Sequence, residues 1–124
     1  MIIADNGRNK YSPPKPPEIE LYSEKRADGS QHSLSAYRDE ADHLIIAGQD
    51  FGPVTKSVSG DGEYEYWYKI DAGYLPRLLV LLGGQPGDDI ITLLEQKWTG
   101  KRSDELGPML RESDIPVNFS SYSG

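Results

Sequence analysis

The clearest pattern in this chain is a strict alternation of residue types over residues 63–70. The even positions hold three tyrosines and an isoleucine, whereas the odd positions hold Glu63, Glu65, Trp67 and Lys69. Successive side chains of a β-strand point to opposite faces of its sheet. The segment therefore predicts a strand with one aromatic face and one charged face that contains a tryptophan, and it leaves open which face is buried.

Three earlier segments also carry strand patterns, and turn signals separate them. Polar and apolar residues alternate over residues 19–22 and 33–38, on either side of Asp28-Gly29. Residues 43–47 are apolar on both faces, which indicates a central strand. Residues 48–53 contain two glycines and a proline, so an irregular exit from this strand is expected. Four strands joined by short turns predict an antiparallel meander.

The second half of the chain has helical periodicity instead. Apolar residues recur at helical spacing over residues 75–82, 88–98 and 103–110. Ser103 is the expected N-cap of the third helix, and Pro108 is expected to delay or kink it. Residues 117–120 alternate again and predict a short last strand. Strands first and helices second predict an α+β fold, in which a four- to five-stranded, mainly antiparallel sheet is followed by two to three helices packed on one face.

The composition of the chain changes at residue 18. Residues 1–17 are rich in proline and predict a flexible tail, whereas residues 18–124 have the size of a single α+β domain. No segment contains the roughly 18 consecutive apolar residues of a membrane span, and the N-terminus lacks the pattern of a secretion signal. The chain contains no cysteine, which fits a reducing compartment. We therefore expect a cytoplasmic protein that does not contact a membrane.

Acidic residues dominate the charge of the chain. There are 20 Asp and Glu residues against 13 Lys and Arg residues, and the formal net charge is −7. A surface of this sign repels nucleic acid, so neither DNA nor RNA is an expected partner. It attracts a cationic surface, which makes a basic protein the expected partner.

Residue types that carry catalysis are present without the spacing that catalysis requires. No serine lies in a Gly-x-Ser-x-Gly elbow, and the only histidines are His32 and His43. The acidic run before His43 lacks the glycine and the spacing of a calcium loop. We therefore expect no catalytic residue, no metal and no cofactor. A small-molecule site or an enzyme active site near Gln49-Asp50-Phe51 is an alternative that stays open.

One group of residues combines aromatic and acidic character, as binding surfaces often do. Trp67 shares a predicted strand face with Glu63 and Glu65, and Tyr37 and Asp50 can join them from neighbouring strands. Tryptophan and tyrosine are enriched at interface hot spots, and their rings attract cations. These five residues predict the site of a basic partner on a non-catalytic binding protein, such as an immunity or inhibitor protein. A homodimeric structural or scaffold protein is a further alternative.

Two motifs in the chain are distinctive, Gly-Gln-Asp-Phe-Gly-Pro at residues 48–53 and Glu-Tyr-Glu-Tyr-Trp at residues 63–67. With the segments 34–39, 75–79 and 115–119, they resemble a group of small acidic bacterial proteins, of actinomycete type, whose function is unknown. The resemblance covers residues 18–121 and implies no activity, so it assigns no catalytic residue. In size and charge the chain is also similar to the immunity proteins of bacterial toxin systems, and this likeness implies protein binding.

Overall fold

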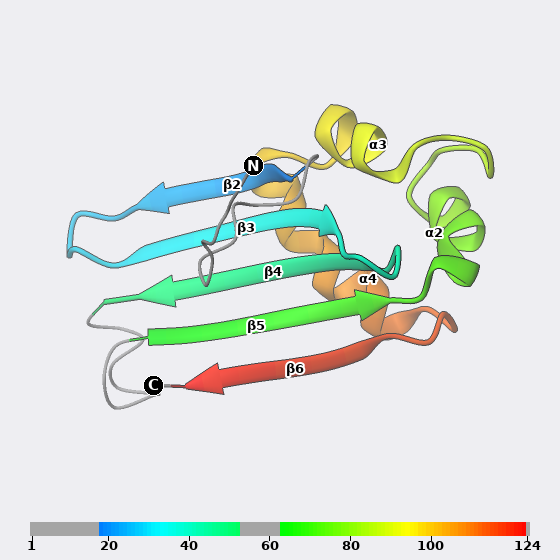
Figure 1. The fold of residues 1–124 in the computed structure, drawn as a ribbon. Helices are drawn as coiled ribbons and strands as arrows, with labels where there is room; N and C mark the ends of the chain where they lie inside the picture. Colours follow the sequence, from blue (N-terminus) through cyan, green and yellow to red (C-terminus); the bar gives the residue numbers. More distant parts are fainter. Residues whose placement is uncertain (1–17, 53–62, 124) are drawn as a thin grey trace, which may run out of the picture.

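The computed structural model describes residues 18–52 and 63–123. The tail predicted for residues 1–17 lies outside them. Within the described residues, five strands form one antiparallel sheet in the order β2-β3-β4-β5-β6. The strands are β2 (Ile19–Lys25), β3 (Gln31–Arg38), β4 (Leu44–Phe51), β5 (Glu63–Ile70) and β6 (Asn118–Ser123). The meander predicted from the first four strands is present, and the last strand returns beside β5 (Figure 1).

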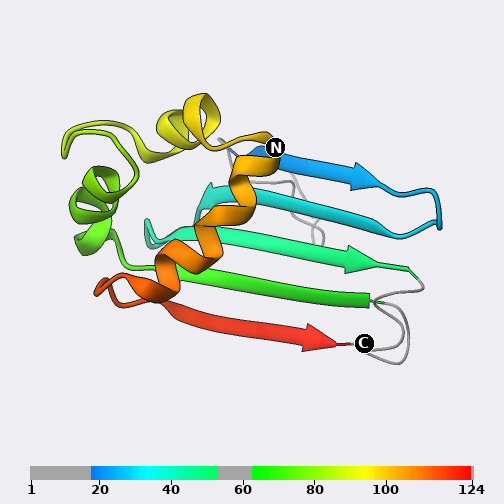
Figure 2. The same ribbon diagram turned by 180° about the vertical axis from the view of Figure 1, so that it is seen from behind.

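The helices of the described residues lie between β5 and β6 in the sequence. They are η1 (Ala72–Tyr74), α2 (Leu75–Leu81), α3 (Ile90–Lys97), η2 (Gly100–Glu105) and α4 (Leu106–Glu112), where η denotes a 3₁₀ helix. In Figure 2 the orange ribbon of α4 runs across one face of the sheet, and α2 and α3 lie beyond the end of the strands. Figure 1 shows the opposite face with no helix of the described residues in front of it. The α+β architecture, an antiparallel sheet with helices on one face, is confirmed.

The tyrosine face of β5 is the one that the helices cover. Tyr68 and Ile70 are buried, and Tyr66 packs against the same core. That core joins the sheet to apolar side chains from every α-helix, among them Leu78 of α2. Because side chains alternate along a strand, Trp67 points to the other face, where it is half-buried. The structure thus settles the question of which face of β5 is buried.

Residues 48–51 form regular strand instead of the irregular exit that we predicted. β4 continues to Phe51, and its residues pair with β3 on one side and β5 on the other. Gly48 lies opposite Tyr66, and a Cβ atom at Gly48 would lie only 2.1 Å from Cζ of that tyrosine. The glycine therefore makes room for an aromatic ring across the strand pair. Glycine within a strand is usually associated with a bend, so the sequence alone does not indicate this packing role.

The third predicted helix consists of a 3₁₀ segment, η2, followed by the α-helix α4. Ser103 lies inside η2, where its hydroxyl donates a hydrogen bond to the carbonyl of Gly100 over 2.7 Å, so it is not the N-cap. Pro108 lies in the first turn of α4, where its fixed φ suits the helix and its missing N–H costs least. α4 begins at Leu106, three residues after Ser103, which agrees with the expected delay. The last strand is also longer than predicted, since it covers Asn118–Ser123.

Candidate functional site

The helix-free face of the sheet is the surface that Trp67 shares with Tyr37, Gln49 and Glu65. Strand pairing fixes this grouping, because Trp67 lies opposite Ala47 and Glu65 lies opposite Gln49. The amide of Gln49 donates a hydrogen bond to the Glu65 carboxylate over 3.0 Å, which holds that carboxylate against the sheet. Three of the residues predicted from the sequence, Tyr37, Glu65 and Trp67, therefore share one surface.

Asp50 lies on the opposite face and does not belong to this surface. It pairs with His32 on one side and Tyr64 on the other, and both point toward the helix side. We predicted that Asp50 joins Trp67 from a neighbouring strand, and the pairing of the strands contradicts this. Since β4 continues to Phe51, the alternation of side chains carries Asp50 to the helix side. Glu63 begins β5, and its side chain lies outside the described part of the chain.

Carboxylates act on two positions of the helix-free face, one beside Trp67 and one at Tyr37. Glu65 lies two positions from Trp67 on the same strand. At Tyr37, burial raises the pKa of the phenol above its ordinary value, and the carboxylates of Glu18 and Asp39 raise it further. The negative potential of these carboxylates disfavours a phenolate at Tyr37, and the same potential attracts a cation. Carboxylates therefore favour a positive ligand near Glu65 and at Tyr37. Lys69, on the other side of Trp67, disfavours one there.

A second cluster of titratable side chains lies on the helix side of the sheet. The Asp50 carboxylate contacts Nδ1 of His32, and the Asp104 carboxylate of η2 lies 3.4 Å from Nε2. The ring of Tyr22 has its centroid 5.7 Å from that of His32. The hydrogen bond to Asp50 raises the pKa of His32 above its usual value, burial acts in the opposite direction, and Asp104 adds to the increase. Both ring nitrogens face carboxylates, which favours the imidazolium form.

Carboxylates engage both ring nitrogens of His32 in this cluster. In the imidazolium form, one N–H donates to Asp50 and the other points at Asp104. The nearby phenol of Tyr66 has its pKa raised by burial and by the charge of Asp50, so it stays neutral. Within the described residues, no group of three His, Cys, Asp or Glu side chains is arranged to hold a metal ion. In this geometry, His32 joins η2 to the sheet through its contact with Asp104.

The pH dependence of stability tests this role of His32. Its pKa is higher in the folded chain than in the unfolded chain, where it is about 6.5. The stabilisation is therefore complete below about pH 6.5 and is lost as the pH rises through the folded pKa. We expect the free energy of unfolding, measured by urea denaturation, to fall over that range. His32→Gln should flatten the fall, and Asp104→Asn should reduce it. A stability that rises with pH over this range would contradict the assignment.

Sequence reasoning missed this cluster because its members meet only in the folded chain. His32 and Asp50 are directly opposite each other on β3 and β4. The turn over residues 39–43 could have revealed this pair. His32 precedes the turn by the same number of residues as Asp50 follows it, so a regular hairpin places the two opposite each other. Asp104 gives no comparable signal, because it lies 72 positions from His32 and reaches it through the packing of η2.

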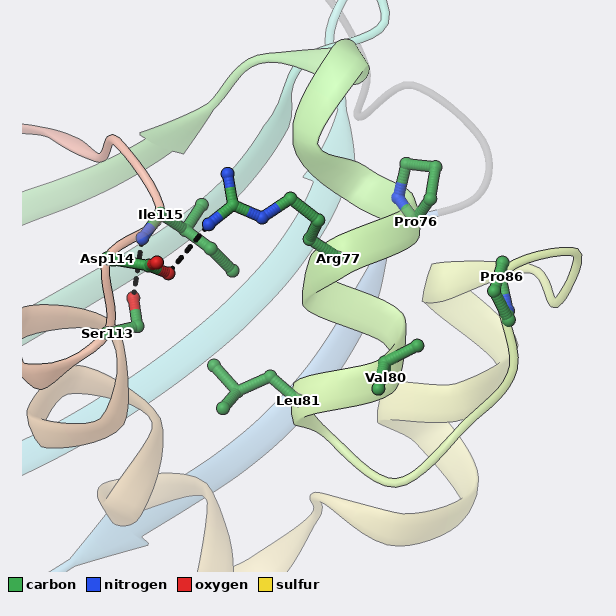
Figure 3. A pocket seen from close by; sticks show the side chains of 8 residues that line it. All are labelled: Pro76, Arg77, Val80, Leu81, Pro86, Ser113, Asp114 and Ile115. Carbon is green, nitrogen blue, oxygen red and sulfur yellow. Dashed lines mark hydrogen bonds and ion pairs between the residues drawn. The ribbon is translucent and has the colours of Figure 1, made fainter.

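A groove of about 520 Å³ lies between α2 and the segment that follows α4 (Figure 3). Its lining residues are Pro76, Arg77, Val80, Leu81, Pro86, Ser113, Asp114 and Ile115. The guanidinium of Arg77 donates to the Asp114 carboxylate over 2.7 Å, so these two charges neutralise each other across the groove. The remaining lining is mainly apolar. This groove therefore offers no net charge to a basic partner, in contrast to the helix-free face.

No helix within residues 18–52 and 63–123 is long and apolar enough to cross a membrane. Comparisons of the chain with protein-family models, with curated proteins and with solved structures give no match. The function is therefore argued from the geometry of the chain's own surfaces.

Proposed function

We propose that this chain is a non-catalytic protein-binding module that engages a basic partner through its helix-free face. The observation that carries the proposal is the position of Trp67, a half-buried aromatic residue on the sheet face that no described helix covers (Figure 1). Tyr37 and Glu65 lie on the same face. Such a module acts in the cytoplasm as an immunity or inhibitor protein, in keeping with the likeness of the chain in size and charge to the immunity proteins of bacterial toxin systems.

The chemistry of the face suits a lysine or arginine side chain of the partner. A cation over the indole ring of Trp67 is attracted to the ring face, and the Glu65 carboxylate, held by Gln49, can pair with it. The net charge of −7 adds long-range attraction that raises the rate of encounter. Lys69 lies on the same face on the other side of Trp67 and repels a cation. The proposed contact therefore lies on the Glu65 side of the tryptophan.

The alternative site near residues 49–51 has weaker support. Gln49, Asp50 and Phe51 are consecutive residues of a regular strand. Their side chains alternate between the two faces of the sheet, so the three cannot converge on one ligand. Asp50 is also engaged by His32. A binding surface on one face needs no such convergence.

Replacing Trp67 with alanine is expected to weaken binding of the basic partner by about 2 kcal/mol, a change of roughly 30-fold in Kd. The reason is the loss of the large aromatic contact, while the buried face of β5 stays unchanged. The parent is first used to capture its partner from host lysate. The captured protein is then purified, and its Kd is measured by titration calorimetry against the parent and each variant.

Two controls separate binding from folding and from charge alone. Val80→Ala removes an exposed apolar side chain from α2, which lines the groove in Figure 3, and should leave Kd unchanged. Glu65→Gln should weaken binding most at low salt, whereas Lys69→Gln should not weaken it. Loss of the folded circular dichroism spectrum in Trp67→Ala, or an equal loss of affinity in Val80→Ala, would refute the proposed surface. An acidic captured partner would refute the proposed chemistry.

A further inference from the structure

The two edge strands of the sheet differ in their protection against pairing with another strand. β2 carries Glu20, Glu24 and Lys25, and its register shifts between Glu20 and Tyr22. Charged side chains and bulges are devices by which proteins block association between sheet edges. β6 has neither, because its sequence contains no charged residue and no proline, and its pairing with β5 is regular.

Within residues 18–52 and 63–123, no strand covers the outer edge of β6. All six of its residues are exposed. Phe119 and Tyr122 are 49% and 53% exposed, respectively. They lie on opposite faces of the sheet, since Phe119 pairs with Tyr68 and Tyr122 pairs with Glu65. The edge thus offers backbone N–H and C=O groups together with one aromatic ring on each face.

We propose that β6 pairs in antiparallel orientation with β6 of a second copy of this chain, so that two sheets join into one. The charge of the chain indicates that the strand pairing with β6 comes from a second copy. A chain with a net charge of −7 repels itself where acidic surfaces meet. The uncharged residues of β6 place no like charges opposite each other in such a pair. Two copies of this acidic chain can therefore pair at β6 without repulsion between the paired side chains.

Two-fold symmetry restricts the register of the pair. An axis perpendicular to the sheet keeps the helices of both copies on the same side and places one residue opposite its own copy. The centre of β6 consists of Ser120 and Ser121, whose small side chains allow close approach at the axis. With Ser120 on the axis, Phe119 lies opposite Ser121 of the second copy and diagonal to its Phe119. Aromatic side chains reach each other across such a diagonal.

The test is the mass of the full-length protein in solution across a dilution series, measured by sedimentation equilibrium. The parent is expected to have the mass of two 13.8 kDa chains at high concentration and to dissociate on dilution. In the double variant Ser120→Lys and Ser121→Lys, one lysine faces its own copy in either register. We expect this variant to raise the dimer dissociation constant by roughly tenfold or more. Ser23→Lys places the same charge on β2 and should leave the dimer intact.

A second measurement keeps the outcome decisive if the lysine variant folds poorly. In the parent, the amide protons of β6 should exchange slowly at high protein concentration, and those facing outward should become fast on dilution. A parent that is monomeric at all concentrations would overturn the proposal. A dimer that Ser23→Lys disrupts, or one whose β6 amides show no concentration dependence, would also overturn it. These readouts need no binding partner, so they stand apart from the test of the helix-free face.

Discussion

Replacing Trp98 with alanine is expected to lower the free energy of unfolding by about 3–5 kcal/mol. Trp98 is 3% exposed and lies at the end of α3. Its indole N–H donates to the carbonyl of Leu82 over 3.0 Å, and the guanidinium carbon of Arg102 lies 4.2 Å from the centroid of its ring. One side chain therefore joins the end of α2, the end of α3 and the beginning of η2. Alanine would leave a cavity at the point where these three elements meet.

The measurement is urea denaturation followed by circular dichroism, because the substitution removes one of the two tryptophans of the chain. Trp98→Phe retains most of the apolar area but takes the donor from the Leu82 carbonyl. It should cost less than alanine, about 1–3 kcal/mol. Val80→Ala is the matched control, because Val80 is apolar and 57% exposed, and its loss should cost less than about 0.5 kcal/mol. Equal effects of Trp98→Ala and Val80→Ala would show that Trp98 does not hold the helices together.

Gly48→Ala is expected to destabilise the fold by about 3 kcal/mol, although it adds a single methyl group. Gly48 and Tyr66 are opposite each other on β4 and β5, and the added Cβ would overlap the tyrosine ring at 2.1 Å. The ring is packed against the core and against its neighbours, with its centroid 5.9 Å from that of Tyr68. It cannot move aside without disturbing that packing.

A double-mutant cycle distinguishes this steric cause from a general effect of losing glycine. In the background of Tyr66→Ser, the added methyl group meets no ring, so Gly48→Ala should cost much less than it does in the parent. Gly87→Ala is the control for the glycine itself, since no atom lies within 4 Å of its added Cβ. Additive effects of Gly48→Ala and Tyr66→Ser in urea denaturation would be incompatible with the proposed contact.

The strands of the sheet could be predicted from the sequence because β2, β3, β5 and β6 alternate over several residues and β4 begins as a short apolar run after a polar break. The alternation of β5 could not show which face is buried, because each face contains large aromatic residues. That choice depends on Gly48, which leaves room for the Tyr66 ring on the helix side, and on the apolar faces of the helices. These are long-range contacts, which local residue patterns do not contain.

The candidate surface could be predicted only in part for the same reason. Tyr37, Glu65 and Trp67 were grouped correctly on one face, because each of them lies inside a segment with a clear strand pattern. Asp50 was misplaced because residues 43–47 are apolar on both faces, so the pattern does not show to which face Asp50 points, and strand pairing places it on the helix side. The ion pair between His32 and Asp104 depends on how η2 packs onto the sheet, and no residue pattern near either side chain indicates it.

The position of β6 beside β5 has a consequence for the chain as it is synthesised. Strands β2 to β5 are joined in sequence and can pair as soon as each hairpin is complete, because their contacts are local. β6 becomes available only after every helix has been made. Until then, the strand that contains Trp67 is itself the edge of the sheet, with its backbone groups open to other chains. The nascent protein therefore exposes an aromatic edge that the finished protein covers with a serine-rich strand.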